Sequence, residues 1–190
     1  PMAEQRAPSP EEVRALVERI VDGTLGATSG TDQPTPSTDA KVTVAIAGDH
    51  GGWRMKDAIG AWLGEHGYAV EDCGTDSDEA VDYPDYARRV AELVADGSCR
   101  WGIVVDGAGI GSAMAANKVP GVRAANCHDI SSARNSREHN YANVLTLGAG
   151  FLGTALALQI VSTWLDTEWG AERHGRRVEK ISRIEQGYAK

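Results

Sequence analysis

The sequence predicts an α/β protein with a three-layer α/β/α, Rossmann-like domain built on a five-stranded parallel sheet. Three observations support this fold class. From residue 41 onward, short apolar runs rich in β-branched residues alternate with longer segments of helical character. The apolar runs have the continuous hydrophobicity of strands that are buried on both faces. Right-handed crossovers between such parallel strands place helices on both sides of the sheet.

The elements of this domain can be assigned in order along the chain. We expect strands at 42–47, 68–72, 103–105, 122–126 and 144–147. We expect helices at 53–65, 86–95, about 111–118, 130–138, 154–165 and 172–188. The first helix ends near Gly67, a residue typical of helix C-termini. The domain is therefore expected to span residues 41–190.

A separate N-terminal segment precedes the domain. Ser9 and Glu12 form a capping box with Pro10 at the first helical position, which predicts an amphipathic helix within residues 1–25. Residues 26–40 contain no large apolar side chain and are rich in Pro, Ser, Thr and Gly, as in a flexible linker. In one interpretation, the helix folds back on its own domain or bundles with copies of itself. In the other, it resembles the encapsulation peptides that direct enzymes into bacterial microcompartments, with residues 9–25 contacting shell proteins.

The composition excludes several classes of function. The formal net charge of −8 argues against a nucleic-acid partner. No apolar stretch approaches the roughly 20 residues that cross a membrane. Cys73, Cys99 and Cys127 are widely spaced and are expected to be reduced thiols of a cytoplasmic protein. The histidines lack zinc-ligand spacing, so neither a metal nor an organic cofactor is predicted.

The segment 101–118 carries the strongest functional signal. Its apolar strand ends at Asp106, three alternating glycines follow (Gly107, Gly109 and Gly111), and an Ala-rich helix begins. Such a loop leaves backbone N–H groups free to hold an anion. Ligands of open α/β sheets bind at this carboxyl edge. The segment therefore predicts a base, Asp106, beside an anion-binding loop, although Asp106 could instead only cap the following helix.

Other polar residues gather in four places: Asp49 and His50 after the first strand, Tyr83 in a loop before a helix, His139 and Asn140 near the end of a helix, and Arg173 and Arg177 on the last helix. Each has an ordinary structural explanation when it is taken alone. Taken together, several lie at strand ends on one side of the sheet. Two arginines at i, i+4 also suit a dianionic phosphate.

These motifs resemble the ribose-5-phosphate isomerase B family, which includes the galactose-6-phosphate isomerase subunits. The matching stretches, in order along the chain, are 48–56, 81–85, 115–119, 132–140 and 173–179. The resemblance implies an aldose–ketose isomerase that opens a phosphosugar ring and moves a proton between C1 and C2 through a cis-enediolate. It also implies a homodimer or tetramer with sites shared between subunits.

The resemblance assigns roles to residues of this sequence. His139, with Asp49, would open the sugar ring. His50, Arg173 and Arg177 would hold the phosphate, and Asn140 and Tyr83 would contact sugar hydroxyls. The amides of the loop (Gly107, Gly109, Ile110 and Gly111) would stabilise the enediolate.

The sequence departs from the family in three respects. Asp106 stands where many members carry a cysteine base, Ser112 stands where others carry a glutamate, and Ala108 and Gly150 replace a hydroxyl donor and an arginine. A carboxylate can still abstract a proton next to a carbonyl when it is desolvated and within reach. The loss of the hydroxyl donor and of the arginine favours a phosphosugar other than ribose 5-phosphate as the substrate. The alternative is a catalytically silent sugar-phosphate-binding or assembly subunit with the same fold.

Overall fold

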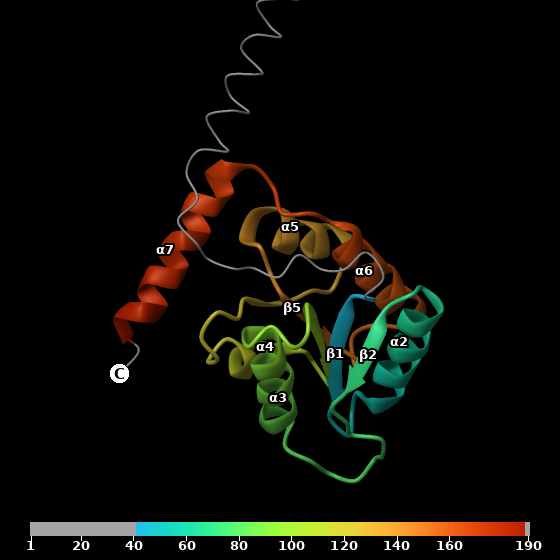
Figure 1. The fold of residues 1–190 in the computed structure, drawn as a ribbon. Helices are drawn as coiled ribbons and strands as arrows, with labels where there is room; N and C mark the ends of the chain where they lie inside the picture. The colour runs from blue at the N-terminus through green and yellow to red at the C-terminus, as the bar shows by residue number, and fades with distance from the viewer. Residues whose placement is uncertain (1–40, 189–190) are drawn as a thin grey trace, which may run out of the picture. The chain divides into compact units, whose positions relative to one another are not determined.

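The computed structural model describes residues 41–188 and confirms the predicted fold class. Five parallel strands form one sheet in the order β2-β1-β3-β5-β4 (Figure 1). The strands are β1 (Thr43–Gly48), β2 (Ala69–Asp72), β3 (Trp101–Asp106), β4 (Ala124–Asn126) and β5 (Val144–Gly148). The helices are α2 (Trp53–Glu65), α3 (Tyr83–Ala95), α4 (Ile110–Ala116), α5 (Ile130–Asn140), α6 (Thr154–Asp166) and α7 (Glu172–Tyr188). The predicted N-terminal helix and linker lie outside the described residues.

Helices cover both faces of the sheet because its central strands are apolar at nearly every position. Val44 and Ile46 of β1 face one core cluster, to which α2, α5 and α6 contribute. Ala45 and Ala47, the alternate residues of the same strand, face a second cluster with α3 and α4. The alternation of side chains along a strand therefore divides one apolar run between two cores.

Most element boundaries lie within two residues of the prediction, and three of the differences have local reasons. Helix α3 begins at Tyr83 because Pro84 suits the first helical turn, so Tyr83 lies in a helix and not in the predicted loop. Strand β4 begins at Ala124, because the Arg123 N–H donates to the Asn143 side chain (2.7 Å) and not to the neighbouring strand. Helix α5 continues to Asn140, where the left-handed Tyr141 ends it.

Helix α7 extends away from the sheet in Figure 1, where it is coloured red. It carries two exposed apolar side chains, Ile181 and Ile184, on one side. Near its start, His174 and Val178 are buried. None of the helices described between residues 41 and 188 is long and apolar enough to cross a membrane.

Candidate active site

The candidate site lies where the chain changes direction across the sheet. From β1 the chain passes to β2 on one side and then returns to β3 on the other. Ligands bind at the carboxyl ends of strands on either side of such a switch point. Asp49 directly follows β1 and Asp106 ends β3, so the sheet order brings these two carboxylates to the same crevice.

Asp49 is buried, and one of its two carboxylate oxygens accepts hydrogen bonds from its own loop. Its Oδ1 accepts hydrogen bonds from the N–H groups of Gly51 (2.9 Å) and Gly52 (3.0 Å). Its Oδ2 has no hydrogen-bond partner among residues 41–188. A Cβ built on Gly51 would lie 3.6 Å from the Gly107 nitrogen, so the loops after β1 and β3 adjoin. Asp49 therefore has one carboxylate oxygen available beside the glycine loop.

Asp106 is engaged on both of its oxygens and is 4% exposed. Its Oδ1 accepts from the backbone N–H groups of Ala108 (2.7 Å) and Gly109. Its Oδ2 accepts from the N–H (3.1 Å) and the hydroxyl of Ser112. Four donors satisfy the acceptor capacity of a carboxylate. The carboxylate in this conformation organises the loop and the start of α4, as the capping interpretation predicted.

The glycine loop is held in one shape by its neighbours. Gly109 has φ of +76°, and a Cβ there would lie 2.5 Å from the Asn126 Oδ1. A Cβ on Gly111 would lie 2.5 Å from the ring of Tyr83, so that ring covers the loop. The Thr146 hydroxyl donates to the Gly109 carbonyl (2.8 Å) from inside the core. Only glycines fit these two positions without movement of their neighbours.

The amides of this loop fall into two groups. Those of Ala108, Gly109 and Ser112 donate to Asp106. Those of Gly107, Ile110 and Gly111 have no partner in the part of the chain that the structure describes. The second group can bind an anionic oxygen without any rearrangement.

His50 and Tyr83 lie at the same edge as the two carboxylates. The Nδ1 atom of His50 accepts a hydrogen bond from the Val81 N–H (3.3 Å), two residues before Tyr83. Together with Ala149, His50 also lines a cavity of about 260 Å³. The ring of Tyr83 is 40% exposed. The structure therefore assembles Asp49, His50, Tyr83, Asp106 and the loop.

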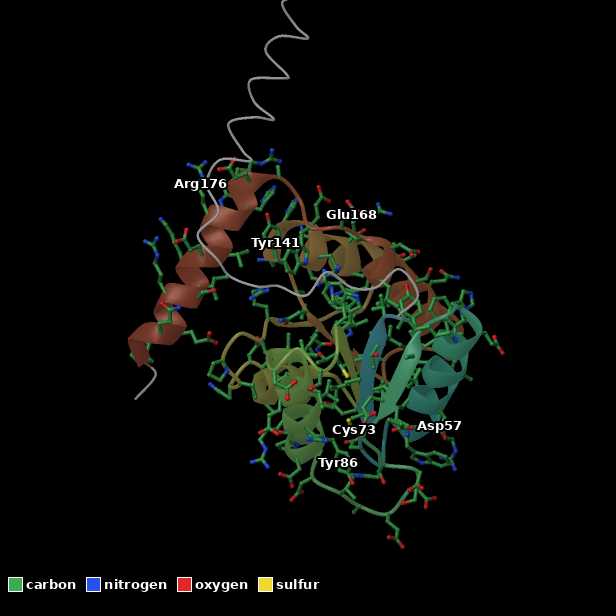
Figure 2. All side chains as sticks on the ribbon, in the orientation of Figure 1. Asp57, Cys73, Tyr86, Tyr141, Glu168 and Arg176 are labelled. Atoms are coloured by element: carbon green, nitrogen blue, oxygen red, sulfur yellow. The ribbon has the colours of Figure 1, made fainter. Side chains whose placement is uncertain are left out.

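The remaining predicted residues lie at the opposite edge of the sheet. Helix α5 leaves the carboxyl end of β4 and returns to the amino end of β5, so its last residues, His139 and Asn140, are far from Asp106. Arg173 and Arg177 belong to α7, which packs against α5. The separation of the two edges can be followed in Figure 2. Tyr141, just after α5, lies in the upper part of the view, and Cys73, just after β2, lies in the lower part. The expectation that His139 lies near Asp49 does not hold within one chain.

His139 is paired with a residue that sequence reasoning missed. Its ring stacks on that of His174 with centroids 4.2 Å apart and an 8° interplanar angle. Its Nδ1 atom lies 2.9 Å from the Asn135 amide nitrogen. The Nε2 atom of His174 is buried without a partner among the described residues. Burial lowers the pKa of His174, and the neighbouring His139 and Arg173 lower it further.

Arg137 connects α5 to α6 from inside the domain. It is 3% exposed and donates to the carbonyl oxygens of Ala142 (2.7 Å), Trp164 (3.1 Å) and Thr167 (3.1 Å). Its guanidinium also lies 3.9 Å from the centroid of the Trp101 ring. Burial lowers the pKa of Arg137 to about 10, with a smaller contribution from Arg100, and the side chain still carries its charge at neutral pH. The carbonyls at the ends of α5 and α6 offset that charge.

The loop after β5 explains one departure from the expected family pattern. The Ala149 N–H donates to the Asp106 carbonyl (2.8 Å), and the Gly150 N–H donates to the Gly107 carbonyl (2.9 Å). A Cβ on Gly150 would lie 2.8 Å from that same Gly107 oxygen. An arginine at this position therefore requires the two loops to separate.

Two further features bear on ligands. A cavity of about 650 Å³ lies between β4, α5 and α7, and of the predicted site residues it includes Asn140. No group of three or more His, Cys, Asp or Glu side chains suited to a metal ion occurs between residues 41 and 188.

Comparison with known proteins identifies relatives of this arrangement. Residues 44–181 match the family described as Ribose/Galactose Isomerase. Ribose-5-phosphate isomerase B of Escherichia coli is 46% identical over 75% of this chain and 96% of its own length. D-erythrulose-4-phosphate isomerase of Pectobacterium atrosepticum is 39% identical over 76% of this chain and 95% of its own. The structure of Clostridium thermocellum ribose-5-phosphate isomerase B superimposes with a TM-score of 0.77 at 50% identity, covering 78% of this chain and all of that one.

Proposed function

The chain belongs to the ribose/galactose isomerase family, and we propose that it is a sugar-phosphate isomerase that interconverts an aldose and a ketose through a cis-enediolate. The observation that carries this proposal is the crevice between β1 and β3. There a carboxylate with one oxygen free (Asp49), a second carboxylate (Asp106) and three amides converge, and neither that oxygen nor the amides have a partner between residues 41 and 188. The reaction needs a base, ring-opening groups and donors for an oxyanion, and it requires no cofactor.

Asp106 is the proposed base. It stands at the end of β3, beside the amides that would hold the enediolate oxygen, and it is almost fully removed from water. A desolvated carboxylate held near a carbon next to a carbonyl can take up its proton. Asp106 would take the proton from C2 while the electron pair of the C1 carbonyl moves onto its oxygen, O1. The amides of Gly107, Ile110 and Gly111, which have no partner among residues 41–188, would stabilise the charge on that oxygen. After a proton passes from O2 to O1, Asp106 would return its proton to C1 as the carbonyl forms at C2.

A second copy of the chain is proposed to complete the site. His139 would open the sugar ring with Asp49, Asn140 would contact a hydroxyl, and Arg173 and Arg177 would hold the phosphate with His50. Within one chain, the α5 and α7 residues lie at the edge of the sheet opposite Asp49 and Asp106. A homodimer or tetramer that brings these two edges together satisfies both sets of roles.

The substrate is proposed to differ from ribose 5-phosphate. Ala108 offers no side-chain donor, and Gly150 cannot be replaced by a larger residue without moving the loop. Loss of one charge-assisted donor costs about 1.5–3 kcal/mol of binding. A tetrose 4-phosphate is a candidate, because one relative is named D-erythrulose-4-phosphate isomerase. Its O4 is esterified, so it cannot close a furanose ring, and the ring-opening role of His139 and Asp49 would apply to pentose and hexose phosphates only.

The proposed function is tested with Asp106→Asn in deuterated water. The wild-type protein is expected to exchange the C2 hydrogen of its substrate with solvent, as measured by NMR, when incubated with tetrose, pentose and hexose phosphates. Asp106→Asn should lose this exchange while it retains the wild-type circular dichroism spectrum. Asp78→Asn, an exposed control, should keep it. Undiminished exchange in Asp106→Asn would exclude Asp106 as the base.

The four hydrogen bonds on Asp106 favour a second candidate, a silent sugar-phosphate-binding or assembly subunit. A carboxylate that already has four donors is committed to holding the loop. The same panel of phosphosugars separates the candidates. A ligand that raises the melting temperature without any exchange or isomerisation would support the silent subunit.

The N-terminal segment is proposed to be a targeting signal and not a part of the catalytic domain. Residues 1–25 would carry the targeting helix, residues 26–40 the linker, and residues 41–190 the enzyme. Residues 9–25 would bind a shell protein of a bacterial microcompartment and place the enzyme in its lumen. Deletion of residues 1–38 should leave isomerase activity and oligomeric state unchanged while abolishing co-purification with shells. A truncated protein that dissociates or loses activity would show that the helix is structural.

A further inference from the structure

Asp106 and the reaction intermediate compete for the same donors. The N–H groups of Ala108 and Gly109 both donate to the Asp106 Oδ1. A backbone N–H carries one hydrogen and makes one strong hydrogen bond. Neither amide can therefore bind an enediolate oxygen while the carboxylate keeps this position. In this conformation only three of the six loop amides, those of Gly107, Ile110 and Gly111, are available to a ligand among the described residues.

Ser112 holds the carboxylate in this position from its other side. Its hydroxyl donates to the Asp106 Oδ2, and its own N–H donates to the same oxygen (3.1 Å). The side chain of Ser112 is fully buried, so no water competes for the hydroxyl. A hydrogen bond to a charged acceptor is stronger in such surroundings than at the surface.

We propose that Ser112 is a positioning residue that holds Asp106 in a resting conformation, from which substrate binding releases it. The second oxygen of the cis-enediolate takes over the amides of Ala108 and Gly109, and the carboxylate turns toward the reacting carbons. The loop can exchange one anion for the other because both are oxygen acceptors of the same charge. This inference rests on the proposed function, since it assumes that Asp106 is the base.

The proposal predicts a gain of function in Ser112→Ala. This change removes the hydroxyl bond and leaves the backbone N–H bond in place. If the resting conformation competes with the binding-competent one, the apparent affinity is reduced by the fraction of protein at rest. Loss of one hydrogen bond to a charged group should shift this balance by roughly tenfold. We expect KM to fall by up to about tenfold with kcat nearly unchanged.

Thr146→Val is the matched control for this experiment. Its hydroxyl is equally buried and donates to the Gly109 carbonyl of the same loop without touching Asp106. Both variants should lose similar stability, but only Ser112→Ala should lower KM. An equal effect of both variants on KM, or a lower kcat in Ser112→Ala, would overturn the proposal.

A second measurement uses the unaltered protein and the phosphosugar that turns over in the panel. The amide resonances of Ala108 and Gly109 should shift in heteronuclear NMR spectra when the sugar binds. In Ser112→Ala they should already be displaced in the free protein. Resonances of these two amides that stay fixed on binding would refute the release of Asp106. Failure of the proposed function would appear differently, as exchange at C2 that survives in Asp106→Asn.

Discussion

Replacement of Arg137 by methionine should destabilise the domain severely and loosen the packing of α5, which carries His139, against α6. Arg137 is 3% exposed and makes hydrogen bonds to three carbonyl oxygens, two of them near the C-terminus of α6 and one just after α5. Each hydrogen bond from a charged donor contributes about 1.5–3 kcal/mol. Methionine fills part of the volume and keeps contacts with the neighbouring tryptophan rings, but it leaves three buried acceptors without donors.

The net cost should be about 3–5 kcal/mol, as is typical when one side of a buried charged arrangement is removed. For a chain of this size, 1 kcal/mol corresponds to about 2–4 °C in melting temperature. Calorimetry should therefore show a decrease of roughly 6–20 °C. Arg134→Met is the matched control, because Arg134 lies on the same helix and is exposed. If Arg137→Met melts within a degree or two of Arg134→Met, the role assigned to the buried arginine is wrong.

Three further predictions concern other parts of the domain. The pKa of His174 is lowered in the folded state, so the folded protein takes up its proton less readily than the unfolded chain. The free energy of unfolding should therefore keep its full value above about pH 6.5 and fall as the pH decreases below it. Melting curves at pH 7.5 and 5.5 should differ less in His174→Phe than in the wild type, and an equal difference would contradict the assignment. Gly111→Ala should raise KM by displacing the Tyr83 ring from the loop, and an unchanged KM would mean that the ring moves freely. Lys56→Met should lower the melting temperature by several degrees, because it removes the partner of Asp72 (2.8 Å) from a position that is 1% exposed; urea unfolding that matches the wild type would refute this.

The fold and half of the candidate site could be predicted from the sequence. Strands that are apolar at nearly every position give a distinctive pattern. A carboxylate at the end of such a strand must lie at the carboxyl edge of the sheet. Asp49, His50 and the glycine loop could be placed for this reason. Short-range signals also identified α7, because Glu172–Tyr188 has a strong helical pattern.

Chain direction determines at which edge of the sheet His139 and Asn140 lie. A helix that connects two parallel strands starts at the carboxyl edge and ends at the amino edge. Residues at the end of α5 therefore belong to the edge opposite Asp106. Helix direction alone is enough to separate the residues at the end of α5 from Asp106.

The conformations of single side chains could not be predicted. Asp106 could have faced the crevice or its own loop, and the choice depends on where Ser112 and the amides lie in space. One sequence feature indicates that Arg137 is buried, because it follows Ala133 by four residues and so lies on the same, buried side of α5. Its carbonyl partners come from segments as distant as Trp164, which no local pattern indicates.

Mixing two inactive variants tests most directly whether each site is built from two chains. Asp106→Asn should disable the carboxyl edge of one chain, and His139→Asn the opposite edge. After exchange of subunits, a mixed dimer contains one site with both substitutions and one with neither. Statistical mixing should then restore about a quarter of wild-type isomerase activity. If subunits exchange, as shown by native mass spectrometry, and activity on the phosphosugar that turns over in the panel stays at the level of the separate variants, the two edges do not form a common site.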